Sequence, residues 1–459
     1  MQRTARSLIP LVMPACLAAC ALTACSSSSG SDQADGKVTI TVQGMPATSD
    51  KAGRATFLAQ IAAFEKANPD IKVVGSDAVW DPQTFATRLA GGSAETVVRV
   101  PLTEPAGLIA KRQVQDISAE LKAWPQYTQY DQRLIAPAKD SSGKVYGLTD
   151  SQYAMGLNYN RALFKKAGLD PDKPPTTWDE VRQDAKTIHE KTGAVGYAET
   201  TTQNGGGWHL TSYTYSRGGT MEKSEGGKQK AAFDDQPTKD ALQLLHDMRW
   251  TDNSMGTTEL QGQLDVWRKF GAGKVGMYID GPSAIVPMVQ QYGLNKEDFG
   301  AAAMPQAGGN ATQIGGTVEM ITAKASAAQR AAAVKWILFE YIKPMYDPAQ
   351  AAAGAKLAAA DPKQLVGVPG LPAFNQAVQD KVNAAIKPYA NVPSANFQPY
   401  LDGSAKLDLK PEPPVAAQKL YGDLDPVVQA VLTNKNADID SLLSGAAKQV
   451  QSDIDSAQS

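Results

Sequence analysis

Lys37-Val-Thr-Ile-Thr-Val42 begins the stretch that decides the fold, because its β-branched residues alternate as they do in a half-buried strand. A second β-branched run follows at Ile71-Lys-Val-Val74. Between the two runs, apolar residues recur at helical spacing, and Asn68-Pro69 ends that segment: Phe57, Leu58, Ile61 and Phe64. The order strand, helix, strand is therefore predicted for residues 37–74.

The same alternation continues along the chain. Residues 85–89 suit a helix that ends at Gly91-Gly92, and residues 97–100 (Val-Val-Arg-Val) suit a third strand. Alternating strands and helices of this length favour an α/β protein with a mostly parallel sheet covered on both faces.

Helix signals recur in the rest of the chain. Thr177-Trp-Asp-Glu180 is a capping box that opens a helix, and Gly193 is placed to end it. Pro411-Glu-Pro-Pro414 reads as an extended connection. Further helices are predicted over residues 238–249, 327–342, 425–432 and 439–454.

The N-terminus carries the pattern of a bacterial lipoprotein signal. Arg3 and Arg6 precede an apolar run over residues 8–22, which is too short for a membrane span. Leu22-Thr-Ala-Cys25 is a lipobox, so we expect a signal peptide over residues 1–24 and lipidation of Cys25, with a flexible tether over 25–36. A plain secretory signal, with Cys25 incidental, is the alternative.

Composition excludes several classes of protein. The chain holds 45 Lys and Arg against 47 Asp and Glu, so it has no excess of positive charge with which to bind nucleic acid. Its three cysteines are Cys16, Cys20 and Cys25, which leaves neither a disulfide framework nor a cysteine metal site after signal removal. The three histidines show no metal-ligand spacing. We expect no cofactor, no metal and a monomer.

Four segments together resemble the extracellular solute-binding proteins of ABC importers, in the sugar-binding group that includes the maltose-binding protein. They follow the family's order and cover nearly all of the chain after the signal. The segments are Ala63–Val73, Gly156–Leu169 with Pro174–Val181, Phe270–Pro282, and Pro426–Thr433 with the helix after it.

The resemblance implies a class II periplasmic-binding-protein fold, in which two α/β lobes are joined by crossing segments and a ligand binds in the cleft between them. Carried over by position, the first lobe comprises residues 37–148 plus 306–343. The second comprises residues 149–305 plus 344–459. The crossings fall near 146–153, near 299–305 and at Lys343-Pro344.

A sugar site needs flat aromatic platforms and polar groups that read hydroxyls. Candidates in the first lobe lie just after predicted strands, at the edge where ligands sit on parallel sheets. Gln43 and Met45 follow the first strand, Trp80 follows the second, and Glu104 follows the third. Loop packing is the alternative for Gln43 and Met45, and a core position for Trp80.

The other candidates come from the middle of the chain. Tyr153 lies at a predicted hinge, and Trp208 lies at the tip of the glycine-rich loop Asn204-Gly-Gly-Gly-Trp208, where it suits a ligand lid. No Gly-Lys-Ser/Thr follows those glycines, which disfavours a nucleotide site.

The strand over residues 274–279 and the segment 315–319 complete the set of candidates. Tyr278 and Asp280 share one side of that strand, since alternate residues of a strand face the same way. Gly316 lets backbone amides approach a ligand, and Glu319 follows it. Ser283 stands where the family often has a tryptophan after Gly-Pro, which suggests a different or smaller ligand.

These features together predict a lipid-anchored substrate-binding protein that captures a carbohydrate, expected to be an oligosaccharide, and delivers it to the membrane subunits of an ABC permease. Hinge closure around the ligand would be the mechanism, without chemistry on the sugar. Two alternatives stay open: the same fold binding a non-sugar solute, and a secreted glycosidase or lyase that uses two carboxylates such as Glu104 and Asp280.

Overall fold

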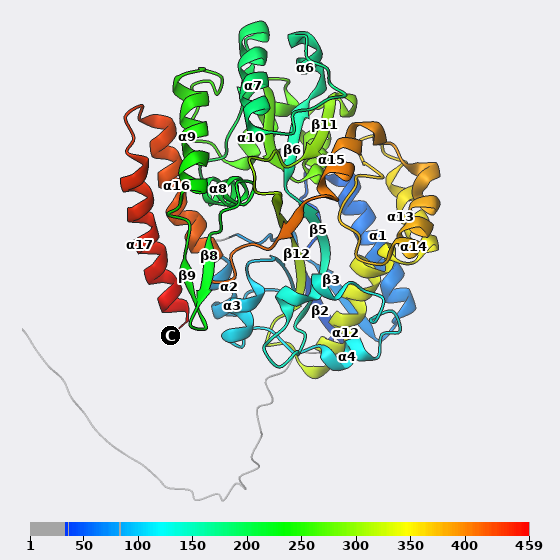
Figure 1. Ribbon diagram of the computed structural model, residues 1–459. Coiled ribbons are helices and arrows are strands. Elements are labelled where there is room, and N and C mark those ends of the chain that lie inside the picture. The colour runs from blue at the N-terminus through cyan, green and yellow to red at the C-terminus, as the bar shows by residue number, and fades with distance from the viewer. Residues whose placement is uncertain (1–32, 35, 82–83, 459) are drawn as a thin grey trace, which may run out of the picture.

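The computed structural model describes residues 33–34, 36–81 and 84–458. The predicted signal peptide and Cys25 lie outside the described residues, so the lipobox stays a prediction. The molecule is mixed α/β, as predicted, and its two larger sheets lie in its lower and upper halves in Figure 1.

The first sheet has seven strands. Its main path is β1-β2-β4-β12-β13, while β3 pairs with β2 and β5 pairs with β12. Their bounds are β1 Gln33–Ala34, β2 Lys37–Val42, β3 Ile71–Gly75, β4 Val97–Pro101, β5 Gly147–Ala154, β12 Ala311–Ile321 and β13 Asp408–Lys410.

Alternation along β2 produces this sheet as predicted. Ile40 and Val42 are fully buried, and α1 (Lys51–Ala67) packs its apolar face onto the same core. The Phe64 ring lies 5.3 Å from that of Trp336, edge to face. Strands β2, β3 and β4 are parallel, as expected, but β4 and β5 both run antiparallel to β12, so the whole sheet is mixed. The difference arises because β12 comes from residues far along the chain and needs no helical crossover to reach β4.

The second sheet has the order β11-β6-β10-β7, and β8 and β9 form a separate hairpin. Strand β6 pairs antiparallel with β10 and β11, while β10 and β7 are parallel. The bounds are β6 Gly156–Asn160, β7 Val195–Tyr197, β8 Glu222–Glu225, β9 Lys228–Ala231, β10 Val275–Asp280 and β11 Phe299–Ala303.

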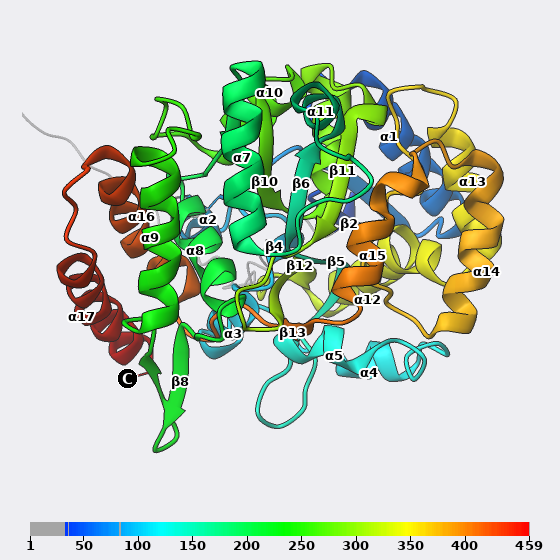
Figure 2. The ribbon, with the colours of Figure 1, turned by 45° about the horizontal axis from the view of Figure 1, so that its top comes forward.

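Helices cover both sheets, as Figures 1 and 2 show. Those in the first half of the chain are α1, α2 Phe85–Gly91, α3 Pro105–Ala110, α4 Ser118–Lys122, α5 Gln132–Ile135, α6 Arg161–Ala167, α7 Trp178–Thr192 and α8 Gly205–Tyr215. Those in the second half are α9 Gln236–Trp250, α10 Gln263–Gly271, α11 Ile285–Tyr292, α12 Ala327–Ile337, α13 Pro348–Ala358, α14 Gln376–Ile386, α15 Gln398–Ser404, α16 Ala417–Thr433 and α17 Ile439–Ala457.

Local signals placed several helices well. The predicted capping box of α7 is present, and Gly193 ends the helix in a left-handed conformation with φ of 73°. Helix α16 begins at Ala417, earlier than the predicted residue 425, and runs through Pro426. Its packing against α8 and α17 outweighs the local cost of a proline within a helix.

The chain passes from the first sheet to the second at Met155, between β5 and β6, and returns between β11 and β12. Phe374, which the expected division assigns to the second lobe, packs in the core beneath the first sheet, with its ring 5.4 Å from that of Tyr130. The division of the chain into lobes remains a proposal.

Candidate ligand-binding site

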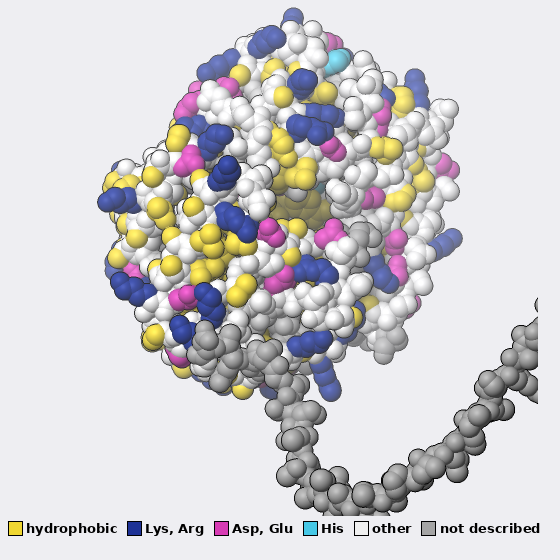
Figure 3. All heavy atoms as spheres, turned by 180° about the vertical axis from the view of Figure 1, so that it is seen from behind, with side chains coloured by type: hydrophobic (Ala, Val, Ile, Leu, Met, Phe, Trp, Pro, Cys, Tyr) yellow, Lys and Arg dark blue, Asp and Glu magenta, His cyan; other side chains and the backbone are white. Residues whose placement is uncertain are grey.

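A cavity of about 320 Å³ lies where segments from both sheets meet. Trp80 follows β3, Pro101 ends β4, Gly316 lies in β12 and Tyr153 lies in β5, all of them on the first sheet. The opposite wall comes from segments around the second sheet: Thr200, Thr202, Gln203, Asn204, Gly205, Trp208, Gln263, Leu264, Gln418 and Tyr421. Glu412, which also lines the cavity, follows β13 of the first sheet. Seen from behind, the molecule is hollowed between its upper and lower halves, with hydrophobic side chains on the floor of the hollow (Figure 3).

Four aromatic side chains line the cavity: Trp80, Tyr153, Trp208 and Tyr421. Trp208 is held by Gln313, whose amide oxygen accepts from Trp208 Nε1 and whose amide nitrogen donates to the Trp208 carbonyl, each at 3.2 Å. The Tyr153 ring packs against two glycines, since a Cβ on Gly281 or Gly315 would fall within 2.7 Å of it. These rings are flat surfaces held in place before any ligand arrives.

The first turn of α8 is capped by a carboxylate from α16. Asp425 Oδ2 accepts from the backbone N–H of Asn204 at 2.8 Å, while Oδ1 accepts from Gly206 at 2.8 Å and Gly207 at 3.1 Å. A Cβ on Gly207 would lie 2.4 Å from Tyr421 Cα, so the glycines let α16 approach. The predicted flexible loop is therefore wrong: residues 205–208 begin a helix, because Asp425 satisfies the N–H groups that a helix start leaves free.

Glu412 supplies the cavity's carboxyl group. Its Oε1 accepts from the Tyr421 hydroxyl at 3.1 Å, and among the described residues no Lys or Arg forms an ion pair with it. Burial raises the pKa of Glu412 to about 8, helped by the nearby carboxylate of Glu104. At neutral pH the cavity therefore carries a carboxyl that is mostly protonated and can donate a hydrogen bond.

Four of the ten predicted contacts line the cavity, namely Trp80, Tyr153, Trp208 and Gly316. Glu104 is half-buried beside it, at the start of α3, and burial raises its pKa.

Two further predicted contacts do not line the cavity. Asp280 is 5% exposed and holds other side chains in place, accepting from Trp267 Nε1 at 2.8 Å and from Gln263 Nε2 at 3.1 Å. It therefore positions Gln263, which does line the cavity. Met45 packs against the core of the first sheet.

The remaining three are buried. Gln43 donates from Nε2 to Glu95 Oε2 at 3.0 Å, which ties β2 to the residue before β4. Tyr278 is 1% exposed and belongs to the core of the second sheet. Glu319 is fully buried and forms an ion pair with Arg99 at 2.6 Å. Gln43 follows β2 as predicted, while Tyr278 lies within β10 and Glu319 within β12, and all three side chains point into the protein.

Sequence reasoning missed most of the second wall, and it missed Glu412. Gln418 and Tyr421 were overlooked because Pro426 suggested a later start for α16. Glu412 lies between prolines in a segment that looked like a simple connection, although a carboxylate in a rigid extended segment was a usable signal. Gln263 and Leu264 carry no local signal at all.

A second cavity, of about 500 Å³, is larger but is built differently. All of its lining comes from residues 195–275, around β7, β10 and α10, and its charged members are Arg268, Lys269 and Lys274. It has no aromatic platform and touches only one sheet. The smaller cavity between the sheets is thus the better candidate for a sugar.

No group of three or more His, Cys, Asp or Glu within the described part of the chain is arranged to hold a metal ion. Over the same residues, no helix is long and apolar enough to cross a membrane.

Residues 48–351 match the family described as bacterial extracellular solute-binding protein. The chain belongs to that family. This confirms the resemblance seen in the sequence, and the family's extracellular character agrees with an extracytoplasmic location.

Curated relatives match over part of their length. The sn-glycerol-3-phosphate-binding periplasmic protein UgpB of Yersinia pestis is 26% identical over 144 residues, covering 29% of this chain and 32% of the relative. The melibiose/raffinose/stachyose-binding protein MelE of Bacillus subtilis is 30% identical over 193 residues, covering 40% of this chain and 39% of the relative. The chain thus spans about a third of the length of these curated relatives. Both relatives are named as binding proteins.

Solved structures match over the whole fold. The GacH receptor of Streptomyces glaucescens, studied unliganded and with acarbose, has a TM-score of 0.71 at 19% identity and covers 91% of this chain and 98% of its own. A solute-binding protein of Thermotoga lettingae bound with α-D-tagatose has a TM-score of 0.71 at 22% identity, covering 91% and 99%. UgpB of Mycobacterium tuberculosis with glycerophosphocholine reaches 0.71 at 18%, covering 92% and 99%. At these identities the likeness establishes the fold.

Proposed function

We propose that this protein is the substrate-binding component of an ABC importer and that it captures a carbohydrate in the cavity between its two sheets. The observation that carries the proposal is the lining itself. Four aromatic side chains surround the cavity together with hydroxyl, amide and carboxyl groups, among them Thr200, Gln263 and Glu412. Sugars offer apolar C–H faces and polar edges, which rings and hydrogen-bonding groups respectively match.

The size of the cavity fits a small sugar. At about 320 Å³ it falls at the lower end of the range of roughly 300–1,000 Å³ for small-molecule sites. Its two walls belong to different sheets, so a ligand touching both is bound best when the walls are close together. Ligand binding would then favour the closed arrangement by the difference in contact energy, which the permease would recognise.

The test is a thermal-shift screen of the mature chain against mono- and oligosaccharides, with binding confirmed by calorimetry. A ligand that binds only the folded state stabilises it, by about 2.7 kcal/mol when the free ligand is at a hundredfold excess over Kd, and therefore raises Tm. Small-angle scattering with the best saccharide should show a smaller radius of gyration. A screen in which no saccharide shifts Tm, while glycerophosphodiesters or peptides do, would contradict the proposal.

We further propose that the sugar leaves unaltered. A glycosidase would need two carboxyl groups on opposite sides of the scissile bond. Of the pair considered in the sequence, Asp280 is unsuited to this role because its carboxylate already accepts hydrogen bonds from Trp267 and Gln263. The carboxyl groups of Glu412 and Glu104 are near enough to interact electrostatically. Incubation with a panel of chromogenic glycosides should give no product above the level of a heat-denatured sample.

Attachment to the membrane through Cys25 is also a proposal, supported by the lipobox and by the extracytoplasmic family. In a bacterial host, wild-type protein should fractionate with membranes and label with a fatty-acid analogue. Cys25→Ser should be unlabelled and fractionate as a soluble protein, because the anchor is then lost. Labelling of Cys25→Ser would show that the lipid is attached elsewhere.

A further inference from the structure

The charges around the cavity bear on which solutes it accepts, if the proposed function holds. A buried phosphate or carboxylate needs a cation or a set of free N–H groups to offset the cost of leaving water. The described residues that line the cavity include no Lys or Arg, and Glu412 supplies an acidic side chain among them. Arg99, the cation that lies within the first sheet near β12, is already paired with Asp150 and Glu319.

Anions also bind commonly at helix N-termini. The N-terminus of α8 lies at the cavity, but the Asp425 carboxylate of the same chain already occupies it. Helix α8 has 11 residues and its first turn borders the cavity through Asn204 and Gly205. A free turn of this kind binds phosphate readily. Here the Asp425 carboxylate accepts from the backbone N–H groups of Gly206 and Gly207 in that turn and of Asn204 just before it. Asp425 is 7% exposed, so those donors are taken.

We propose that the cavity discriminates against anionic solutes, phosphorylated sugars included, because its lining offers them no cation, and that Glu412 strengthens this discrimination when its carboxyl ionises. This inference rests on the proposed function, since it concerns which members of the carbohydrate class bind. Glu412 interacts with Tyr421 and, at longer range, with Tyr153, Tyr215 and Glu104, and none of these offers a positive charge. A phosphate entering the cavity would meet a carboxyl without a compensating cation.

The role of Glu412 can be tested by comparing ligand affinities at two pH values, because its carboxyl changes charge between them. Its pKa of about 8 means that the carboxyl is mostly neutral at pH 7 and mostly charged at pH 9. A sugar phosphate is already doubly charged across this range, since its second pKa is about 6. Repulsion should therefore grow between pH 7 and pH 9 for the phosphate ester and stay unchanged for the neutral sugar.

The experiment is calorimetry at pH 7 and pH 9 with a neutral saccharide and its phosphate monoester, starting with maltose and maltose 1-phosphate and continuing with the best saccharide of the thermal-shift screen. For the wild type, the ester should bind at least about tenfold more weakly at pH 7 (about 1.4 kcal/mol), and the gap should widen by a further several-fold at pH 9. In Glu412→Gln the gap should no longer widen with pH.

Glu222 offers a matched control. Burial raises its pKa to about 8 as well, but it lies in β8 and does not line the cavity. Glu222→Gln should keep the wild-type widening. Equal widening in Glu412→Gln and wild type, or an ester that binds as tightly as the neutral sugar, would overturn the inference while leaving carbohydrate binding intact. If no neutral saccharide binds at all, the proposed function fails and this inference falls with it.

Discussion

Thr103 and Gln418 are joined by a hydrogen bond of 2.9 Å from Gln418 Nε2 to Thr103 Oγ1, although 315 residues separate them in the chain. Thr103 follows β4 of the first sheet, and Gln418 lies in α16 against the second wall of the cavity. The amide of Gln418 also accepts from Asn204 Nδ2 at 2.9 Å through its oxygen. One side chain thus joins the first sheet to the start of α8, beside the cavity.

Removing that contact should loosen the two walls. We expect Thr103→Val to weaken saccharide binding about fivefold, since a hydrogen bond of this kind contributes roughly 1 kcal/mol net. Calorimetry measures the loss, and scattering should show a larger radius of gyration without ligand. Thr433→Val is the control, because its hydroxyl bonds only within α16, to the Gln429 carbonyl. Unchanged affinity in Thr103→Val would show that the contact does not hold the walls together.

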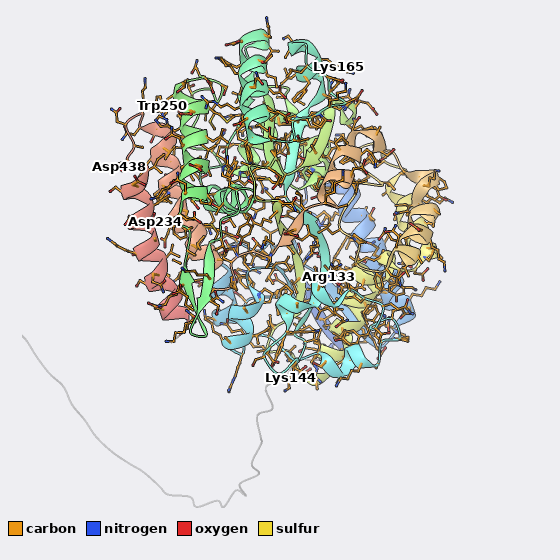
Figure 4. All side chains as sticks on the ribbon, viewed as in Figure 1. Arg133, Lys144, Lys165, Asp234, Trp250 and Asp438 are labelled. Atoms are coloured by element: carbon orange, nitrogen blue, oxygen red, sulfur yellow. The ribbon has the colours of Figure 1, made fainter. Side chains whose placement is uncertain are left out.

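Trp208 should be a major contributor to affinity. Trp208→Ala removes one ring from the lining and should weaken saccharide binding by about tenfold, or about 1.4 kcal/mol, by loss of stacking. Trp250 serves as the comparison: it lies at the end of α9, near the outer edge of the molecule in Figure 4, and does not line the cavity. Its Nε1 donates to the Val431 carbonyl. Trp250→Ala should leave saccharide affinity unchanged even if it lowers Tm.

Arg99 should be important for stability. Its guanidinium pairs with Asp150 and Glu319, whose side chains are 6% and 0% exposed. Arg99→Ala leaves two buried carboxyls without a cation, so we expect the free energy of unfolding to fall by about 3–5 kcal/mol.

Arg133 provides the contrast for Arg99. Its side chain is 86% exposed and pairs with Asp131 at the surface. Arg133→Ala should change the free energy of unfolding by less than about 1 kcal/mol in the same urea titration. Similar losses for both variants would argue against a special role for the buried pairs.

Gly207 should tolerate no side chain. A Cβ at this position would lie 2.4 Å from both Cα and the carbonyl oxygen of Tyr421, which are backbone atoms that cannot rotate away. We expect Gly207→Ala to cost about 1–3 kcal/mol of stability and to weaken saccharide binding, because α16 must shift with Gln418 and Tyr421. Gly445→Ala, in α17 with nothing near its Cβ, should instead be neutral or stabilise by up to about 1 kcal/mol.

Glu222 should make stability depend on pH. Burial raises its pKa from 4.5 to about 8, which nearby backbone at Val415 only partly offsets. Between pH 4.5 and 8 the unfolded chain releases this proton while the folded chain retains it, so the free energy of unfolding falls as pH rises through this window. Glu222→Gln should gain about 2 kcal/mol over the wild type at pH 8 and little at pH 4.5, measured by urea unfolding. An equal effect at both pH values would point to packing rather than charge.

Much of the fold was predictable because its signals are local. Strand β2 matches the predicted residues 37–42, and α7 begins and ends where its capping box and Gly193 indicate. These features depend on neighbours within a few residues, through side-chain alternation and satisfied helix ends. The start of α16 was not predictable in this way, since contacts with α8 override the proline in its middle.

The candidate site was only partly predictable. Trp80 and Trp208 could be picked out in sequence because an aromatic residue just after a strand, or beside a run of glycines, suits a ligand platform, although a core position was the alternative for Trp80. Gln43, Tyr278 and Glu319 have residue types that suit a sugar site, but they face inward. Gln43 bonds to Glu95, Tyr278 packs in the core of the second sheet, and Glu319 pairs with Arg99. Which way such a side chain faces depends on what packs against the strand.

The sequence by itself determined the alternation of strands and helices, several helix ends such as those of α7, the lipobox and the likeness to solute-binding proteins, because each depends on residues close together along the chain. Only the tertiary structure decided the composition of the cavity, since Trp80, Gly316 and Glu412 meet there from distant segments. It also decided that the start of α8 is closed to anions, because the carboxylate that fills it belongs to Asp425, more than two hundred residues away.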